Sequence, residues 1–330
     1  MKIPHRRQFL HLAAGAAALP VISRIARAQT YPSRPITLVV PFPAGGPLDT
    51  VARITADAMR APLGQPVIVE NVSGAAGTLG VGRVARAAAD GYTIGAGFVG
   101  THVINGATYT LQYDLLKDFE PISLIATNSW LIVAKKDMPA SDLKGLIAWL
   151  KGNPDKASQG TVGPGSPHHV AGIFFQKKTG TRFQFVPYRG AAPVMQALVA
   201  GQIELMIDSP TIVLPQVRGG TIKAYAVAAK SRLPTAPDIP TVDEAGLPAF
   251  YVSSWSGLWA PKGTPKEAVA KLNSAVATGL ADAAVRSRFA DNGMQVFPPE
   301  QQTPEALRAH QKAEIEKWWP IIKEAGIKAE

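Results

Sequence analysis

Short runs of Val, Ile and Leu alternate along the chain with stretches of helical periodicity. At five junctions the apolar run passes through a glycine- or proline-rich loop into a helix-like segment. These loops lie at 41–47, 71–77, 160–167, 187–193 and 208–210. Such alternation predicts an α/β fold with largely parallel sheets.

The first junction has the clearest pattern, because its expected helix has one apolar and one charged face. Gly45 and Gly46 in the preceding loop let the backbone approach a ligand closely. The unpaired N–H groups that begin a helix add donors and a positive dipole end. The apolar face carries Val51, Ile54 and Ala58, and the charged face carries Arg53, Asp57 and Arg60. We therefore expect the loop to hold an anion such as a carboxylate.

The other junctions repeat this design with their own start and stop signals. Ser166 is placed as an N-cap and Pro167 as the first helical residue, while Gly201 is expected to end the helix over 194–200. In open α/β sheets ligands bind beyond the carboxyl ends of the strands, where all five loops belong. Tight packing alone explains any one such loop, but their repetition favours a shared binding cleft.

The first 28 residues have the features of an export signal, which we expect to be cleaved after Ala28. Arg6 and Arg7 precede an Ala-rich apolar run that ends at Ile22. The paired arginines favour twin-arginine export, and Sec export stays open. The apolar run is shorter than the ~20 residues that a membrane-spanning helix needs, which disfavours stable membrane insertion.

Charge and cysteine content narrow the function classes. The net charge is +10 for the whole chain, but residues 29–330 hold 29 basic and 24 acidic residues without a basic stripe. Nucleic-acid binding is therefore not indicated, whereas a mild positive field favours small anions. The chain has no cysteine, which removes disulfides, thiolate metal sites and cysteine nucleophiles.

Nine motifs follow one another along nearly the whole mature chain. They are PFPAGGPLD (41–49), ENVSGAAGTLG (70–80), ADGYTIGAGFVGTHVIN (89–105), DFEPIS (118–123), GPGSPHHVAG (163–172), VPYRGAAPVMQALVAGQIELMID (186–208), PTVDEAGLP (240–248), SSWSGLWAPKGTP (253–265) and KWWPIIKEAGIK (317–328). In this order they resemble the tripartite tricarboxylate transporter substrate-binding proteins, the TctC or Bug receptor family.

The resemblance implies a two-lobed periplasmic binding protein of type II, the Venus-flytrap fold, with the ligand cleft between the lobes. One lobe would comprise 29–128 plus 254–330 and the other 129–253. The last helix, with Trp318 and Trp319, would pack on the first lobe, and those tryptophans are expected in the core.

The resemblance also implies a receptor without a cofactor or metal, expected to be a monomer, that binds a small carboxylate such as a di- or tricarboxylate, an acidic amino acid or an aromatic acid. Its partner would be the inner-membrane permease of a tripartite tricarboxylate transporter, or a sensor protein. The implied ligand-binding residues are Phe42, Ala44, Gly45, Gly46, Asp49, Ala75, Gly77 and Thr101 in the first lobe and Ser166, His168, Tyr188, Ala192 and Asp208 in the second.

Three of the residues leave their roles open. Asp49 is expected to order its loop rather than to contact the ligand directly. Asp208 either accepts a hydrogen bond from the ligand or caps the turn at Ser209 and Pro210. Trp130 either packs at the junction of the lobes or forms an aromatic wall for a ring-bearing acid.

The alternative function is an exported cofactor-dependent enzyme such as an oxidoreductase. Residues 95–100 match G-x-G-x-x-G after a strand, but 102–110 does not have the pattern of the helix that a dinucleotide site requires. His168 and His169 lie beside Ser166, yet adjacent histidines point to different sides of a helix and no G-x-S-x-G elbow is present. The loops also lack the clustered ligands of a metal site.

Overall fold

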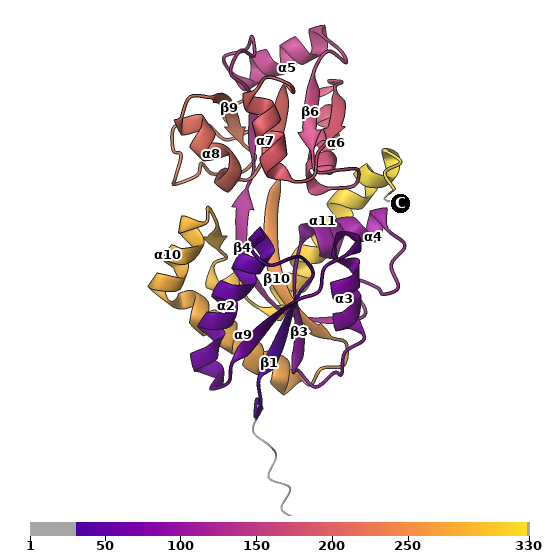
Figure 1. Ribbon diagram of the computed structural model, residues 1–330, viewed down its shortest axis with the longest axis vertical. Coiled ribbons are helices and arrows are strands. Elements are labelled where there is room, and N and C mark those ends of the chain that lie inside the picture. The colour runs from indigo at the N-terminus through magenta and orange to yellow at the C-terminus, as the bar shows by residue number, and fades with distance from the viewer. Residues whose placement is uncertain (1–30, 329–330) are drawn as a thin grey trace, which may run out of the picture.

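The computed structural model describes residues 31–328, which form two lobes, each built around one β-sheet (Figure 1). The expected export signal lies outside these residues. In the first lobe the strands follow the order β11 (Gln295–Val296), β4 (Phe119–Ser129), β10 (Ser253–Pro261), β3 (Thr93–Phe98), β1 (Ile36–Val40) and β2 (Val67–Asn71). Its α-helices are α2 (Pro47–Leu63), α3 (Thr78–Ala85), α4 (Asn105–Thr108), α9 (Lys266–Ala281), α10 (Ala283–Asp291) and α11 (Pro304–Glu324).

The second lobe contains a five-stranded sheet covered by four helices. Its strand order is β7 (Gln184–Pro187), β6 (Ser158–Thr161), β8 (Leu205–Asp208), β5 (Leu131–Lys135) and β9 (Ile222–Val227). The helices are α5 (Leu143–Gly152), α6 (Pro167–Thr179), α7 (Ala191–Val199) and α8 (Pro210–Arg218).

Each sheet combines parallel strands with antiparallel ones at the crossing between the lobes. Strands β1, β2 and β3 are parallel, as are β6, β7 and β8. Strand β10 runs antiparallel to β3 and β4, and β5 runs antiparallel to β8 and β9. The expected parallel sheets are therefore confirmed for the strands that precede the glycine loops, while the sheets as a whole are mixed.

The first helix matches its sequence pattern closely. Val51 and Ile54 of α2 are buried, Ala58 is half-buried, and the charged face is exposed. A Cβ atom added at Gly279 would lie 2.7 Å from the Cβ of Ala58, so α2 and α9 pack at a distance that only glycine permits. This contact holds α2 closely against α9 in the first lobe.

Some predicted helix boundaries need correction. Helix α7 starts at Ala191 rather than at Val194. From the sequence, the helix after the loop 71–77 was expected to include Ala88, but α3 ends at Ala85. Leu79 in the first turn of α3 is 57% exposed. The stop at Gly201 is confirmed by its positive φ of 72° and by its N–H, which donates to the Leu198 carbonyl.

The G-x-G-x-x-G stretch is followed by helical structure, so the expectation that no helix opens after it was wrong. A π-helical turn over Gly100–Ile104 leads directly into α4. The glycines serve packing instead, because a Cβ atom at Gly97 would lie 2.1 Å from Nδ1 of His102. The His102 ring stacks on Trp259 with centroids 3.7 Å apart, which fills the space beside the strand.

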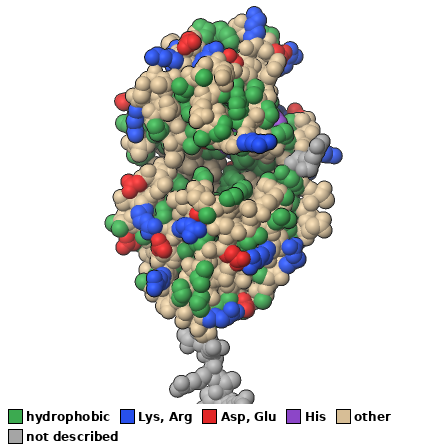
Figure 2. Space-filling model, viewed as in Figure 1, with side chains coloured by type: hydrophobic (Ala, Val, Ile, Leu, Met, Phe, Trp, Pro, Cys, Tyr) green, Lys and Arg blue, Asp and Glu red, His purple; other side chains and the backbone are tan. Residues whose placement is uncertain are grey.

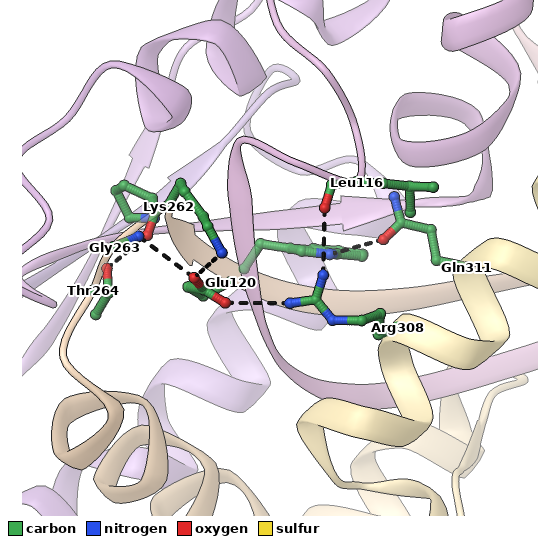
Figure 3. A network of polar contacts seen from close by, with 9 residues as sticks. Leu116, Glu120, Lys262, Gly263, Thr264, Arg308 and Gln311 are labelled. Atoms are coloured by element: carbon green, nitrogen blue, oxygen red, sulfur yellow. Dashed lines mark hydrogen bonds and ion pairs between the residues drawn. The ribbon is translucent and has the colours of Figure 1, made fainter.

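The last helix is bound to the first lobe by a fully paired buried amide. Gln311 Nε2 donates to the carbonyls of His102 and Leu115, and its Oε1 accepts from Nε1 of Trp259. One turn earlier, Arg308 donates to the carbonyl of Leu116 and to Glu120, which also accepts from Lys262 (Figure 3).

The same helix also reaches the second lobe. Trp318 is buried, as expected for a core residue, and its ring meets Phe174 of α6 edge-on. Lys317 Nζ donates to the carbonyl of Tyr251 at 2.6 Å. Helix α11 therefore spans both lobes rather than only the first. Within residues 31–328 no helix is long and apolar enough to cross a membrane.

We expect Gln311→Leu to lower the free energy of unfolding by about 3 kcal/mol, because it removes three buried hydrogen bonds. Urea denaturation monitored by tryptophan fluorescence measures this loss. The control is Lys312→Met on the exposed side of the same helix, where stability should stay within about 0.5 kcal/mol. Equal effects of the two changes would contradict the role assigned to Gln311.

Acid should destabilise the fold through His102. Burial lowers the pKa of His102 from its usual 6.5 to about 3, so the unfolded chain binds a proton in this range and the folded one does not. Stability therefore falls as pH decreases from 6.5 towards 3. His102→Gln should be less stable at pH 7, but its further loss between pH 6.5 and 4 should be about 3 kcal/mol smaller. Parallel stability curves for the two proteins would contradict this assignment.

Candidate functional site

The glycine loops of both lobes follow the carboxyl ends of parallel strands. Strand β1 ends at Val40, which is paired in register with Asn71 at the end of β2, so the loops 41–46 and 72–77 start side by side. In the second lobe, β6, β7 and β8 lead into α6, α7 and α8 in the same way. Figure 2 shows the surface hollowed in a band between the two lobes.

The loop before α2 is fixed by the buried carboxylate of Asp49. Its Oδ2 accepts from the N–H of Gly45 and from Nε of Arg53, both at 2.8 Å. Its Oδ1 accepts from Nδ2 of Asn71, which also donates to the carbonyl of Phe42. Burial alone would raise the pKa of Asp49, but these hydrogen bonds lower it to about 2. Asp49 is therefore charged at neutral pH and orders the loop, as expected.

The backbone N–H groups available to a ligand at the start of α2 differ from those expected from the sequence. The N–H of Gly45 is used by Asp49, so it is not available to a ligand. The first intrahelical hydrogen bond runs from the N–H of Thr50 to the carbonyl of Gly46. The N–H groups of Leu48 and Asp49 precede it and have no intrahelical partner. Gly46 caps the helix without a side-chain hydrogen bond, and Ala44 is exposed in the loop.

Three predicted residues from three different loops converge in the first lobe. A Cβ atom at Gly77 would lie 2.8 Å from Cγ2 of Thr101 and 3.2 Å from the ring of Phe42. Gly77 has a φ of +91°, and Ala75 also has a positive φ of 45°. The loop before α3 thus folds tightly against the other two, with Ala75 on the exposed side.

Thr101 lies beneath this contact and is completely buried. Its hydroxyl accepts from the N–H of Phe98 at 3.1 Å and lies 3.0 Å from Nδ1 of His102. These partners occupy the hydroxyl within the lobe, so Thr101 supports the loops from below.

The second lobe presents a helix start whose cap was predicted correctly. Oγ of Ser166 accepts from the N–H of His169, and Pro167 follows as the first residue of α6. The two histidines point to different sides, as expected. Nδ1 of His169 accepts from the N–H of Gly165, whereas Nε2 of His168 lies 3.0 Å from Oδ2 of Asp208.

Asp208 is buried at the end of β8 and holds the next helix start as well. Its Oδ1 accepts from the N–H of Ser209 at 2.5 Å, directly before Pro210 begins α8. The capping role considered for Asp208 is thus present, together with the pairing to His168.

The other two predicted second-lobe residues, Tyr188 and Ala192, lie near the start of α7. The N–H of Tyr188 donates to the carbonyl of Thr161, which fixes this loop to β6. Tyr188 is half-buried against the second-lobe core, and Ala192 is exposed in the first turn of α7.

Trp130 lies at the junction of the lobes, as its packing interpretation expects. Its N–H donates to the carbonyl of Val252, and its carbonyl accepts from the N–H of Ala228. The side chain is 5% exposed and its ring lies 4.6 Å from that of His168, at an angle of 37°.

Comparison with known proteins decides the family. The model of the tripartite tricarboxylate transporter family receptor matches residues 51–327. The chain belongs to this family. As a TctC-type receptor it is 33% identical to Protein BugT of Bordetella pertussis over 97% of this chain and 96% of that protein.

Two solved structures of Rhodopseudomonas palustris proteins are similar to this receptor over almost their entire length. MatC with bound malate is 41% identical, with a TM-score of 0.76, covering 88% of this chain and 100% of that one. A protein with adipate, Rpa4515, is 34% identical, with a TM-score of 0.78, covering 91% and 100%. The predicted two-lobed periplasmic binding protein fold is confirmed.

The list of ligand-binding residues stays a prediction for this TctC-type receptor. The structure brings Phe42, Gly77 and Thr101 into contact in one lobe, and His168 with Asp208 in the other. Sequence reasoning missed Asn71, which joins two loops through its side chain. Its position at the end of a strand, before a glycine loop, was the available signal. Among residues 31–328 no group of three His, Asp or Glu side chains could hold a metal ion.

We expect Asp49→Ala to loosen the loop before α2, because it removes three hydrogen bonds from a buried carboxylate. Amide hydrogen exchange at Gly45 should become faster, and stability at pH 7 should fall by about 3 kcal/mol. The folded-state pKa lies below the usual 3.8, so the wild-type advantage persists above pH 3.8 and disappears towards pH 2.

Asp57→Ala on the same helix is the matched control, because Asp57 is exposed and forms an ion pair with Arg288 at the surface. It should change neither exchange at Gly45 nor stability by more than about 0.5 kcal/mol. Unchanged exchange in Asp49→Ala would contradict the loop assignment.

Proposed function

We propose that this protein is an exported periplasmic receptor that captures a small carboxylate between its two lobes. The observation that carries the proposal is the arrangement of glycine-rich helix starts on both lobes along one hollow. Backbone amides at helix N-termini complement an anion without an arginine clamp. The malate and adipate held by its R. palustris relatives point to the same ligand class.

The proposed mechanism is binding without chemistry. An open receptor takes up the carboxylate, closure of the lobes buries it, and the closed form is recognised by a partner. That partner is the permease of a tripartite tricarboxylate transporter or a sensor protein. We further propose that the receptor works as a monomer, without a cofactor, after cleavage behind Ala28.

In this proposal lobe 1 comprises 29–128 plus 254–330, and lobe 2 comprises 129–253. Two features support a movement of one lobe relative to the other about their junction. The two sheets share no strand, and β4 and β10 border the crossing between them. Apart from the contacts that α11 makes with the second lobe, such as those with Phe174 and Tyr251, the lobes touch through small groups. Oγ1 of Thr211 donates to the carbonyl of Asn292, and a Cβ atom at Gly165 would lie 3.3 Å from Thr108.

The alternative of a cofactor-dependent oxidoreductase finds less support in the local geometry. A dinucleotide fingerprint needs glycines that leave room for a pyrophosphate beside the helix start. Gly97 instead faces the rings of His102 and Trp259, and Gly100 faces the ring of Phe98. These contacts favour a packing role for the motif.

A thermal-shift screen of residues 29–330 tests the proposal. The ligands are di- and tricarboxylates, acidic amino acids and aromatic acids, with nicotinamide cofactors and divalent metals alongside. A carboxylate present at 100 times its Kd should raise Tm by about 5 °C, because it binds only the folded state. A shift with a cofactor or metal alone would instead support the enzyme alternative.

A further inference from the structure

Helix α11 has a proline in its interior, directly after a residue that anchors the helix to the first lobe. The helix runs from Pro304 to Glu324 with Pro320 inside it. Trp319, the residue before this proline, donates from Nε1 to the carbonyl of Val103 at 2.9 Å. Together with the paired amide two turns earlier, this hydrogen bond fixes the helix to the first lobe up to Pro320.

The part of α11 beyond Pro320 reaches the second lobe, where it lies beside α6 (Figure 1). Glu324, the last residue of α11, forms an ion pair with Lys177 of α6. The two side chains are 65% and 51% exposed. Such exposed pairs contribute little to stability, so this contact is easily broken and formed again.

The turn that ends α11 adds an apolar contact to the same lobe. Gly326 has a φ of +64°, and the N–H of Ile327 donates back to the carbonyl of Ile322. This turn carries the side chain of Ile327, which is 7% exposed, to the loop before α6. A Cβ atom at Gly165 in that loop would lie 3.7 Å from Cγ2 of Ile327. The buried isoleucine therefore supplies more of the attachment than the ion pair.

Pro320 makes the helix easier to bend between these two attachments. It lacks the N–H that would bond to the carbonyl of Glu316, and a proline ring crowds the carbonyl four residues earlier. Interior prolines are therefore common bending points of helices. Both Glu316 and Pro320 are exposed, so water can bond to the carbonyl that has lost its helical donor. Bending at this point costs no buried hydrogen bond.

We propose that residues 321–328 form a clasp on α6, and that Pro320 lets this clasp follow the second lobe when the lobes open and close. This inference rests on the proposed function, in which the lobes move. A contact that wide opening breaks favours the less open states of the protein. The clasp therefore restrains opening without preventing it, and it raises the affinity for any carboxylate that both lobes enclose.

Double electron–electron resonance between two spin labels tests the clasp in residues 29–330 without any ligand. The chain has no cysteine, so Arg60→Cys on α2 and Gln196→Cys on α7 carry the labels at unique sites. Both positions are exposed, and the two helices belong to different lobes (Figure 1). Ile327→Ala removes most of the apolar contact, so the mean distance between the labels should increase by more than about 2 Å.

Two further variants show whether this change originates at the clasp. Lys177→Glu places a like charge opposite Glu324 at the surface and should lengthen the distance by a smaller amount. Val285→Ala is the matched control, because it shortens a side chain that packs on the core of the first lobe, and it should leave the distance unchanged. A distance that is the same in Ile327→Ala as in the unmodified clasp would overturn the proposal.

The role of Pro320 has its own test in the width of the distance distribution. Pro320→Ala restores a helical N–H and removes the crowding ring, so the distribution should become narrower. Pro304→Ala is the control, because a proline in the first turn of the same helix replaces no helical hydrogen bond. A width that is unchanged in Pro320→Ala, or equally reduced in Pro304→Ala, would overturn the bending role of Pro320.

Isothermal titration calorimetry separates this inference from the receptor function. Malate and adipate, the acids held by two relatives, serve as probes. Ile327→Ala should weaken the binding of both by a similar factor of about three, because it acts on the equilibrium between open and closed states. Unchanged affinities would overturn the effect of the clasp on binding. Absence of binding to every carboxylate of the wider screen would overturn the receptor function, whereas the distance measurement would still decide on the clasp.

Discussion

Every proposed ligand contact depends on the hydrogen bonds that join the two crossing segments at the lobe junction. Strands β4 and β10 pair along their length in the first lobe. Beyond their ends the N–H of Trp130 donates to Val252, and the N–H groups of Ala228 and Val252 donate to Trp130 and Ala228 respectively. Because these few bonds connect the sheets, they set the position of one row of helix N-termini relative to the other.

Helix α11 adds a second constraint on that relative position. Gln311 anchors it to the first lobe, and further along Lys317 and Trp318 contact Tyr251 and Phe174 of the second. A helix that packs on both lobes restricts the directions in which they can separate. The junction and this helix together favour a motion that opens the hollow on the side away from α11.

The sequence predicted those parts of the site that are specified locally. The cap at Ser166, the proline after it and the stop at Gly201 each depend on neighbours within one turn. The hydrogen bond between the side chains of Asp49 and Asn71 joins residues 22 positions apart, so no local sequence pattern predicts it. The π-helical turn after β3 was not predicted for the same reason. The space beside Gly97 is limited by Trp259 of β10, a strand that is distant in the sequence.

Two buried acids, Asp49 and Asp208, lie among the residues proposed to bind the ligand, and both are occupied by hydrogen bonds within the protein. Asp49 orders the amide of Gly45 and is paired with Arg53, while Asp208 orders the amide of Ser209 and is paired with His168. Each acid therefore fixes a loop by accepting a backbone N–H, and each is also bound by a neighbouring side chain. Under the proposed function, selectivity would depend on the fixed positions of backbone donors rather than on the net charge of the protein.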